Sequence, residues 1–143
     1  MARTQYVIII GCGRLGATLA NRLSPEGHSV VVVDWEEAAF RGLSSGFGGF
    51  QIIGDAAEFS VLKQAGIEKA DALLAVTGED TLNLMVAQVA QSVFQVEQVL
   101  ARVFDPSREQ IYQAFGIATI SPTSLAADCF IEQLQIGASI AVL

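Results

Sequence analysis

Residues 6–16 read Tyr-Val-Ile-Ile-Ile-Gly-Cys-Gly-Arg-Leu-Gly, and this stretch decides the fold class. Its first five residues are mostly β-branched, which is typical of a strand buried on both faces of a parallel sheet. From residue 14 to 23, leucines recur every four positions, which predicts a helix with one apolar face. The glycines between strand and helix match Gly-x-Gly-x-x-Gly in the strand–turn–helix context of a dinucleotide-binding unit. The stretch therefore predicts the first βαβ unit of a Rossmann domain.

Each glycine of this motif has a separate task. Gly11 permits the tight turn, Gly13 lets the backbone approach a pyrophosphate, and Gly16 allows close packing of helix on strand. The free N–H groups and the positive end of the helix dipole then face the phosphates. The candidate phosphate-binding residues are Gly11, Cys12, Gly13, Arg14, Leu15 and Gly16.

Two residues inside the loop have alternative interpretations. Arg14 is either a phosphate ligand or a solvated first-turn residue. A cation there opposes the helix dipole unless an anion is present, which favours the ligand role. Cys12 is either a redox-sensitive thiol, because a helix N-terminus lowers a thiol pKa, or a small residue that fits the turn. The second interpretation is favoured.

Asp34 ends the second predicted strand, 18 residues after Gly16. A carboxylate at this point accepts hydrogen bonds from ribose hydroxyls and repels a 2′-phosphate, so NADP is disfavoured. Asp34 is alternatively the N-cap of the next helix, a role that does not exclude ribose binding. Trp35 follows, either beside an adenine ring or as a partly exposed packing residue.

The rest of the chain alternates strands and helices, which predicts an α/β fold with a doubly wound, six-stranded parallel sheet in the order 3-2-1-4-5-6. The predicted strands are 6–10, 29–34, 50–53, 72–76, 98–103 and 117–120. The predicted helices are 14–23, 36–43, 59–65, 81–93, 106–116 and 122–136.

Ligands of open α/β sheets lie at the carboxyl ends of the strands. Asp55 and Ala56, after the third strand, are therefore expected beside the adenine, and Thr77 and Gly78, after the fourth, on the ribose or phosphate side. Either pair is alternatively plain loop. The only histidine, His28, precedes the second strand at the opposite end of the sheet, so no catalytic residue is predicted.

The composition argues against several classes of partner and of protein. Of the 143 residues, 16% are charged and the net charge is −7, which disfavours nucleic acid and anionic membranes as partners. Two cysteines without a CxxC pair suggest neither a disulfide framework nor a metal site. The first residues lead straight into a strand, so no signal peptide is expected. No apolar run is long enough to span a bilayer, and a cytoplasmic location is the simplest prediction.

The chain resembles the nucleotide-binding regulatory subunits of potassium channels and transporters known as RCK, KTN or TrkA-N domains. The similarity covers nearly the whole chain in the right order. It lies in residues 9–16, 32–34, 54–56, 62–66, 70–72, 75–77, Asp80 with Asn83, 101–103, 116–117 and 120–122.

This resemblance implies a cytosolic subunit, peripheral to the inner membrane face, that binds ATP, ADP, AMP or NAD(H). Such subunits form dimers, within an octameric ring, under a membrane pore-forming protein. The family's phosphate loop corresponds to Gly11, Gly13, Arg14 and Gly16, its ribose acid to Asp34 and its adenine-side pair to Asp55 and Ala56. Thr77 and Asn83 match positions near the phosphate side, and Arg102 matches a strand end that faces the cleft.

Two features depart from the family. Members often carry a second, C-terminal lobe, for which this chain has no room. Calcium-gated members use acidic residues on the fifth strand, where this chain has Ala101-Arg102-Val103, so no calcium site is expected. The alternatives to potassium regulation are a nucleotide sensor for another transporter and the cofactor domain of a dehydrogenase. The lack of a substrate domain and of a well-placed His or Lys argues against the dehydrogenase.

Residues 1–121 are predicted to form the nucleotide-binding domain and residues 122–143 an oligomerisation helix. Apolar residues occur on more than one side of this helix, because the adjacent Phe130 and Ile131 point about 100° apart. A monomer would expose them as a patch. The apolar positions of the segment are Leu125, Cys129, Phe130, Leu134, Ile136 and residues 140–143. The family's last helix likewise crosses to the partner subunit.

Overall fold

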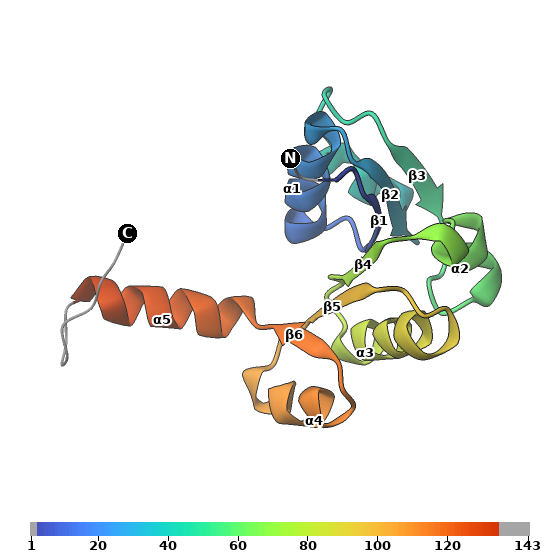
Figure 1. Cartoon of the computed structure of the whole chain (residues 1–143). Coiled ribbons are helices and arrows are strands. Elements are labelled where there is room, and N and C mark those ends of the chain that lie inside the picture. The colour runs from blue at the N-terminus through green and yellow to red at the C-terminus, as the bar shows by residue number, and fades with distance from the viewer. Residues whose placement is uncertain (1–2, 135–143) are drawn as a thin grey trace.

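The structure is a computed structural model that describes residues 3–134. Its centre is a parallel sheet in the order β3-β2-β1-β4-β5-β6 (Figure 1). The strands are β1(Tyr6–Ile10), β2(Ser29–Asp34), β3(Phe50–Ile53), β4(Ala72–Ala75), β5(Gln98–Arg102) and β6(Ala118–Ile120). The predicted Rossmann order is confirmed.

The helices lie between successive strands, except the last, which follows β6. They are α1(Arg14–Leu23), α2(Phe59–Gln64), α3(Asp80–Gln88), α4(Glu109–Ala114) and α5(Pro122–Leu134). Short 3₁₀ turns complete the connections: η1(Ser24–Glu26), η2(Glu37–Gly42), η3(Ile67–Lys69) and η5(Pro106–Arg108). A π-helical turn, η4(Val89–Val93), follows α3.

The core has two layers because side chains alternate along each strand. On one face of β1, Ile8 and Ile10 pack in a cluster that includes Leu62 of α2 and Val86 of α3. On the other face, Val7 and Ile9 pack with α1 and η2. β1 pairs with β2 on one side and with β4 on the other, which places the glycine loop after β1 at the centre of the sheet.

Three predicted helices differ in form, and one of them, 106–116, is the turn η5 followed by α4. The segment 36–43 is the 3₁₀ turn η2, in which Gly42 lies so close to α1 that an added Cβ would come within 3.0 Å of Ala17 Cβ. The segment 81–93 is α3 followed by the wider turn η4, after which Val96 N donates to Ala90 O and leads into β5.

Helix α5 leads away from the sheet (Figure 1), and none of its described residues is buried. The oligomerisation helix was predicted over residues 122–143, and the part at residues 135–143 lies outside the described residues. Across residues 3–134, no helix combines the length and the apolar character needed to cross a membrane.

Candidate nucleotide-binding site

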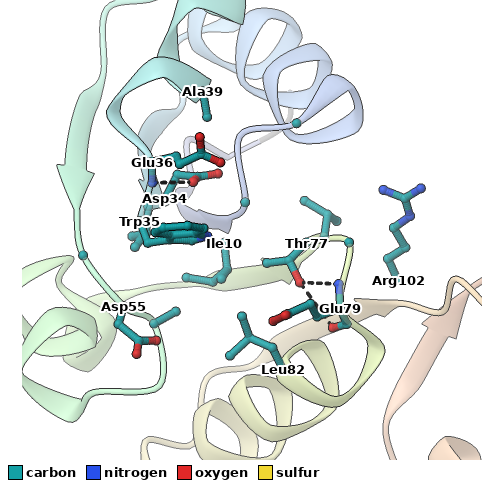
Figure 2. Close-up of a pocket in the computed structure, with 17 residues that line it drawn as sticks. Ile10, Asp34, Trp35, Glu36, Ala39, Asp55, Thr77, Glu79, Leu82 and Arg102 are labelled. Carbon is teal, nitrogen blue, oxygen red and sulfur yellow. Dashed lines mark hydrogen bonds between the residues drawn. The ribbon is translucent and has the colours of Figure 1, made fainter.

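A cavity of about 430 Å³ lies at the carboxyl ends of the central strands, within the range typical of small-molecule sites. Figure 2 shows Trp35 and Asp55 on one side of this cavity and Thr77, Glu79 and Arg102 on the other. The lining residues are Ile10, Gly11, Gly13, Val33, Asp34, Trp35, Glu36, Ala39, Gly54, Asp55, Ala56, Val76, Thr77, Gly78, Glu79, Leu82 and Arg102.

The glycine loop has the backbone geometry that its motif requires. Gly11 has φ +105°, and a Cβ there would lie 3.0 Å from Thr77 Cα, so this position needs glycine for both conformation and space. A Cβ on Gly16 would lie 1.9 Å from Gly11 O. Gly16 therefore sets the close approach of α1 to the loop, as predicted.

Gly13 is the N-cap of α1, where no side chain caps the helix. A Cβ on Gly13 would meet no atom within 4 Å, because its Cα faces open space at the cavity. The first-turn amides of α1 have no intrahelical acceptors. An uncapped N-terminus of this kind is suited to hold a phosphate.

Asp34 connects the glycine loop to the end of β2. Its Oδ2 accepts from Cys12 N at 2.8 Å, and its Oδ1 accepts from Glu36 N at 2.9 Å (Figure 2 shows the second bond). A carboxylate has about four acceptor sites, so two remain for ribose hydroxyls. The N-cap of η2 is Glu36 rather than Asp34.

The ends of β4 and β5 are joined by Asn83 of α3, which is fully buried. Its Oδ1 accepts from Thr77 N at 2.9 Å and from Thr77 Oγ1 at 2.6 Å. Its Nδ2 donates at 3.0 Å to the carbonyls of both Thr77 and Arg102. Asn83 thus positions two residues of the cavity lining, Thr77 and Arg102.

Arg102 supplies the single cationic side chain among the lining residues. Its Nε is buried and, within residues 3–134, makes no hydrogen bond. Its Cζ lies 5.2 Å from the centre of the Phe104 ring, a cation–π contact that orients the guanidinium. A buried N–H without an acceptor is costly, so Arg102 is poised to receive an anionic group.

The TrkA-N domain family model matches residues 7–122, which include every residue of the cavity lining. The chain belongs to the TrkA-N domain family.

Curated relatives are similar in sequence over most of this chain. The Trk system potassium uptake protein TrkA of Streptomyces coelicolor is 41% identical over 130 residues, which are 91% of this chain and 58% of that protein. The homologue from Pyrococcus abyssi is 32% identical over 91% of this chain and 60% of its own length. This chain therefore spans about three fifths of the length of these relatives.

Solved structures share the TrkA-N fold. The TrkA-N domain of the inner membrane protein ybaL from Escherichia coli aligns with TM-score 0.80 and 18% identity, over 94% of this chain and 99% of that one. The GsuK channel bound to NAD aligns with TM-score 0.79 and 22% identity, over 94% and 24%. The Shewanella denitrificans Kef C-terminal domain in its AMP-bound form aligns with TM-score 0.75 and 25% identity, over 94% and 83%.

This TrkA-N domain brings most of the predicted site residues together. Those that line the cavity are Gly11, Gly13, Asp34, Trp35, Asp55, Ala56, Thr77, Gly78 and Arg102. Arg14 is exposed in the first turn of α1 and lies outside the lining. Leu15 faces an apolar depression over β4, β5 and β6 instead. Gly16 is buried behind the loop.

Asn83 and Cys12, both predicted as binding residues, lie outside the cavity lining. The side chain of Asn83 is fully buried, and its hydrogen bonds go to Thr77 and Arg102. The burial of Cys12 agrees with its favoured interpretation as a small residue that fits the turn. Burial raises the pKa of the Cys12 thiol, and the negative charge of Asp34 raises it further, so the reactive thiolate is disfavoured.

Sequence reasoning missed two acidic residues of the TrkA-N cavity, Glu36 and Glu79. Glu36 follows Asp34 by two residues, and Glu79 follows Thr77 by two residues. Their nearness in sequence to predicted site residues at strand ends is the signal that could have identified them. Asp80, which follows Glu79, is buried and accepts from Phe104 N at 2.6 Å and Asp105 N at 3.0 Å. Asp80 therefore holds the loop after β5 in place and is not a ligand-binding residue. In the described part of the chain, no group of three or more His, Cys, Asp or Glu is placed to bind a metal.

Proposed function

We propose that this TrkA-N domain is a nucleotide-sensing regulatory unit for potassium transport, with an adenine nucleotide or NAD(H) as its ligand. The observation that carries the proposal is the cavity itself. It combines an uncapped helix N-terminus behind Gly11 and Gly13, a carboxylate with free acceptor sites at Asp34, and an unsatisfied guanidinium at Arg102. These groups complement phosphates and ribose hydroxyls.

The ligand and the transported ion are supported by related proteins. The AMP-bound Kef domain and the NAD-bound GsuK channel bind nucleotides on this fold. The curated relatives are potassium uptake proteins of the Trk system. We place the adenosine beside Trp35, Asp55 and Ala56, its ribose on Asp34, and the phosphates at the glycine loop within reach of Arg14 and Arg102.

We further propose that the unit regulates rather than catalyses. His28 lies at the opposite end of the sheet, where its Nδ1 accepts from Gln5 N. Among residues 3–134, the cavity lining includes neither His nor Lys for acid–base catalysis. We assign the domain to the cytoplasmic side of the membrane, bound to a membrane potassium transporter or channel. The acidic net charge supports protein partners over nucleic acid or anionic lipid.

Nucleotide binding is expected to change the fluorescence of Trp35, the only tryptophan of the chain. Its side chain is 72% exposed and borders the cavity, so an adenine ring would cover it. Titration with AMP, ADP, ATP, NAD and NADH, each repeated by calorimetry, measures the affinities. Trp35→Phe controls for signal arising elsewhere. Absence of calorimetric binding for all five at about 1 mM, equivalent to about −4 kcal/mol, would contradict the proposal.

We propose that α5 joins two or more copies of the chain. Its apolar side chains Leu125, Phe130, Ile131 and Leu134 are each more than half exposed. A second uncovered apolar surface lies on the sheet, where Leu15, Leu74 and Ile120 border a depression of about 130 Å³. Two uncovered apolar surfaces on one chain support self-association.

The full chain is expected to be at least a dimer by light scattering, whereas a version that ends at Ser121 should be a monomer. In the full chain, Phe130→Asp should weaken the assembly, because it places a charge on the apolar face, and the neighbouring polar exchange Gln133→Asp should not. A monodisperse monomer of the full chain at tens of micromolar would refute this role for α5. So would an unchanged oligomer after the truncation.

A further inference from the structure

A second cavity, the amino-end cavity, lies where three neighbouring strands begin. Its lining includes Tyr6, Ser29 and Phe50, which are the first residues of β1, β2 and β3. Its volume is about 310 Å³, which is enough for a small ligand. Within the described part of the chain, the lining contains no acid, lysine or arginine, so a charged ligand would find no ionic partner there.

Backbone forms part of the wall of the amino-end cavity. Gly48 N–H donates to Ser24 Oγ at 2.8 Å, which joins the loop before β3 to the turn before β2. A Cβ on Gly49 would lie 2.1 Å from Val30 O, so this glycine lets the loop pack directly on β2. By contrast, a Cβ on Gly27 would meet no atom within 4 Å, and one on Gly48 would meet only Ser24 Oγ, at 3.8 Å. The loops are thus fixed in place while the space beside them stays open.

His28 supplies a hydrogen-bond donor to this cavity. Its Nδ1 accepts from Gln5 N–H at 3.1 Å, so Nδ1 carries no proton. The proton of the neutral ring is therefore on Nε2, which can only donate. Ser24 Oγ already accepts from Gly48 N–H, and its own hydroxyl proton adds a second donor to the lining. The polar part of the cavity therefore suits a ligand with hydrogen-bond acceptors.

Two aromatic rings belong to the same cavity. Tyr6 pairs with Ser29 and Phe50 pairs with Val31, so their side chains lie on one face of the sheet, on the strands either side of β2. Tyr6 is held by its hydroxyl, which donates to Ala65 O at 2.6 Å. Phe50 is 74% exposed, and its uncovered ring is available to pack against another ring.

We propose that the amino-end cavity is a second ligand site, for a small uncharged molecule that combines an aromatic ring with a hydrogen-bond acceptor. The ring packs against Phe50, and the acceptor receives the N–H of His28 Nε2. A nucleotide does not fit this description, because its phosphates would have no cation in the lining. The two cavities share no residue, so this site does not depend on the proposed nucleotide-binding function.

The test uses benzamide, which carries an uncharged ring and a carbonyl acceptor, on the full chain. His28 is the only histidine, so its imidazole nitrogen signals in NMR spectra are unambiguous. Benzamide should shift these signals saturably with a Kd of about 1 mM, ordinary for so small a ligand. Saturating AMP should leave this Kd unchanged. Toluene, which lacks the acceptor, and acetamide, which lacks the ring, should each bind about fivefold more weakly or worse.

Two variants test the two contacts separately. His28→Asn keeps an acceptor for Gln5 N–H but removes the Nε2 donor, and Phe50→Ala removes the exposed ring. Each should weaken benzamide binding about fivefold or more, measured by saturation transfer to the ligand. Phe115→Ala is the matched control, because Phe115 is also an exposed aromatic residue, at 55%, and lies outside both cavities. Phe50→Ala decides the outcome if His28→Asn disturbs the start of β1.

Several results would overturn the proposal. One is the absence of a saturable His28 shift with benzamide up to about 10 mM, tenfold above the expected Kd. Another is displacement of benzamide by AMP, which would place the probe in the nucleotide cavity. Equal affinities of Phe50→Ala and Phe115→Ala would remove the ring contact, and toluene binding as tight as that of benzamide would remove the donor role of His28.

Discussion

Asp34→Ala is expected to weaken nucleotide binding by at least tenfold while the fold remains intact. The loss has two sources in the structure. The ribose loses two charge-assisted hydrogen bonds, each worth roughly 1.5–3 kcal/mol. The glycine loop also loses the acceptor that holds Cys12 N at 2.8 Å, so the phosphate site becomes less ordered.

Calorimetry on NAD and AMP measures this loss, and circular dichroism checks the fold. Glu37→Ala is the matched control, because Glu37 is an exposed acid three residues further on that lies outside the cavity lining. Asp34→Asn tests the contribution of the charge, because it preserves the size of the side chain but carries no charge. An affinity unchanged by Asp34→Ala would remove this carboxylate from the ribose role.

Gly16→Ala is expected to destabilise the fold, whereas Gly13→Ala is expected to weaken nucleotide binding. At Gly16 an added Cβ would lie 1.9 Å from Gly11 O and 2.9 Å from Gly11 C, both backbone atoms that cannot turn aside. Overpacking of this kind costs roughly 1–3 kcal/mol, and more where the surroundings cannot move. At Gly13, φ is −75° and the added Cβ meets nothing within 4 Å, so stability should change by less than about 1 kcal/mol.

The Gly13 methyl group would, however, occupy the space through which a phosphate approaches the loop. Gly13→Ala should therefore fold normally and bind nucleotide at least tenfold more weakly, an effect of about 1.4 kcal/mol or more. Urea unfolding measures the first property and calorimetry the second. Comparable stability of the two variants would show that α1 shifts to accommodate a side chain at Gly16. Undiminished binding by Gly13→Ala would place the phosphates elsewhere.

Much of the candidate site was predictable because its signals are local or follow from the topology. The positive φ of Gly11 and the close approach of Gly16 to Gly11 are backbone features within six residues of chain, whereas the close approach of Gly11 to Thr77 follows from the pairing of the strands. Asp34, Asp55 and Thr77 lie at strand ends, and parallel strands bring their carboxyl ends to one edge of a sheet. Once the βαβ pattern is recognised, their common location follows without side-chain coordinates.

Two residues could not be given a single role from the sequence, because one sequence signal had competing physical outcomes. A cysteine at a helix N-terminus is expected to have a lowered thiol pKa, but burial and Asp34 act on Cys12 in the opposite direction. Asn83 stands near the strand ends in sequence and in the family pattern. Neither the sequence position nor the family pattern reveals that α3 directs the Asn83 side chain inward. There its hydrogen bonds go to Thr77 and Arg102.

By itself, the sequence determined the Rossmann fold, the strand order and the position of the glycine loop, because periodicity, glycine spacing and the handedness of βαβ connections are properties of the chain. Only the tertiary structure decided which polar groups face the cavity and which of them still have hydrogen bonds to offer. The Thr77 hydroxyl bonds to Asn83, six residues further on, and to Glu79 N, two residues further on, whereas within residues 3–134 the buried Nε of Arg102 has no partner. Hydrogen-bonding capacity is shared among neighbours in space, so it can be counted only after the chain has folded.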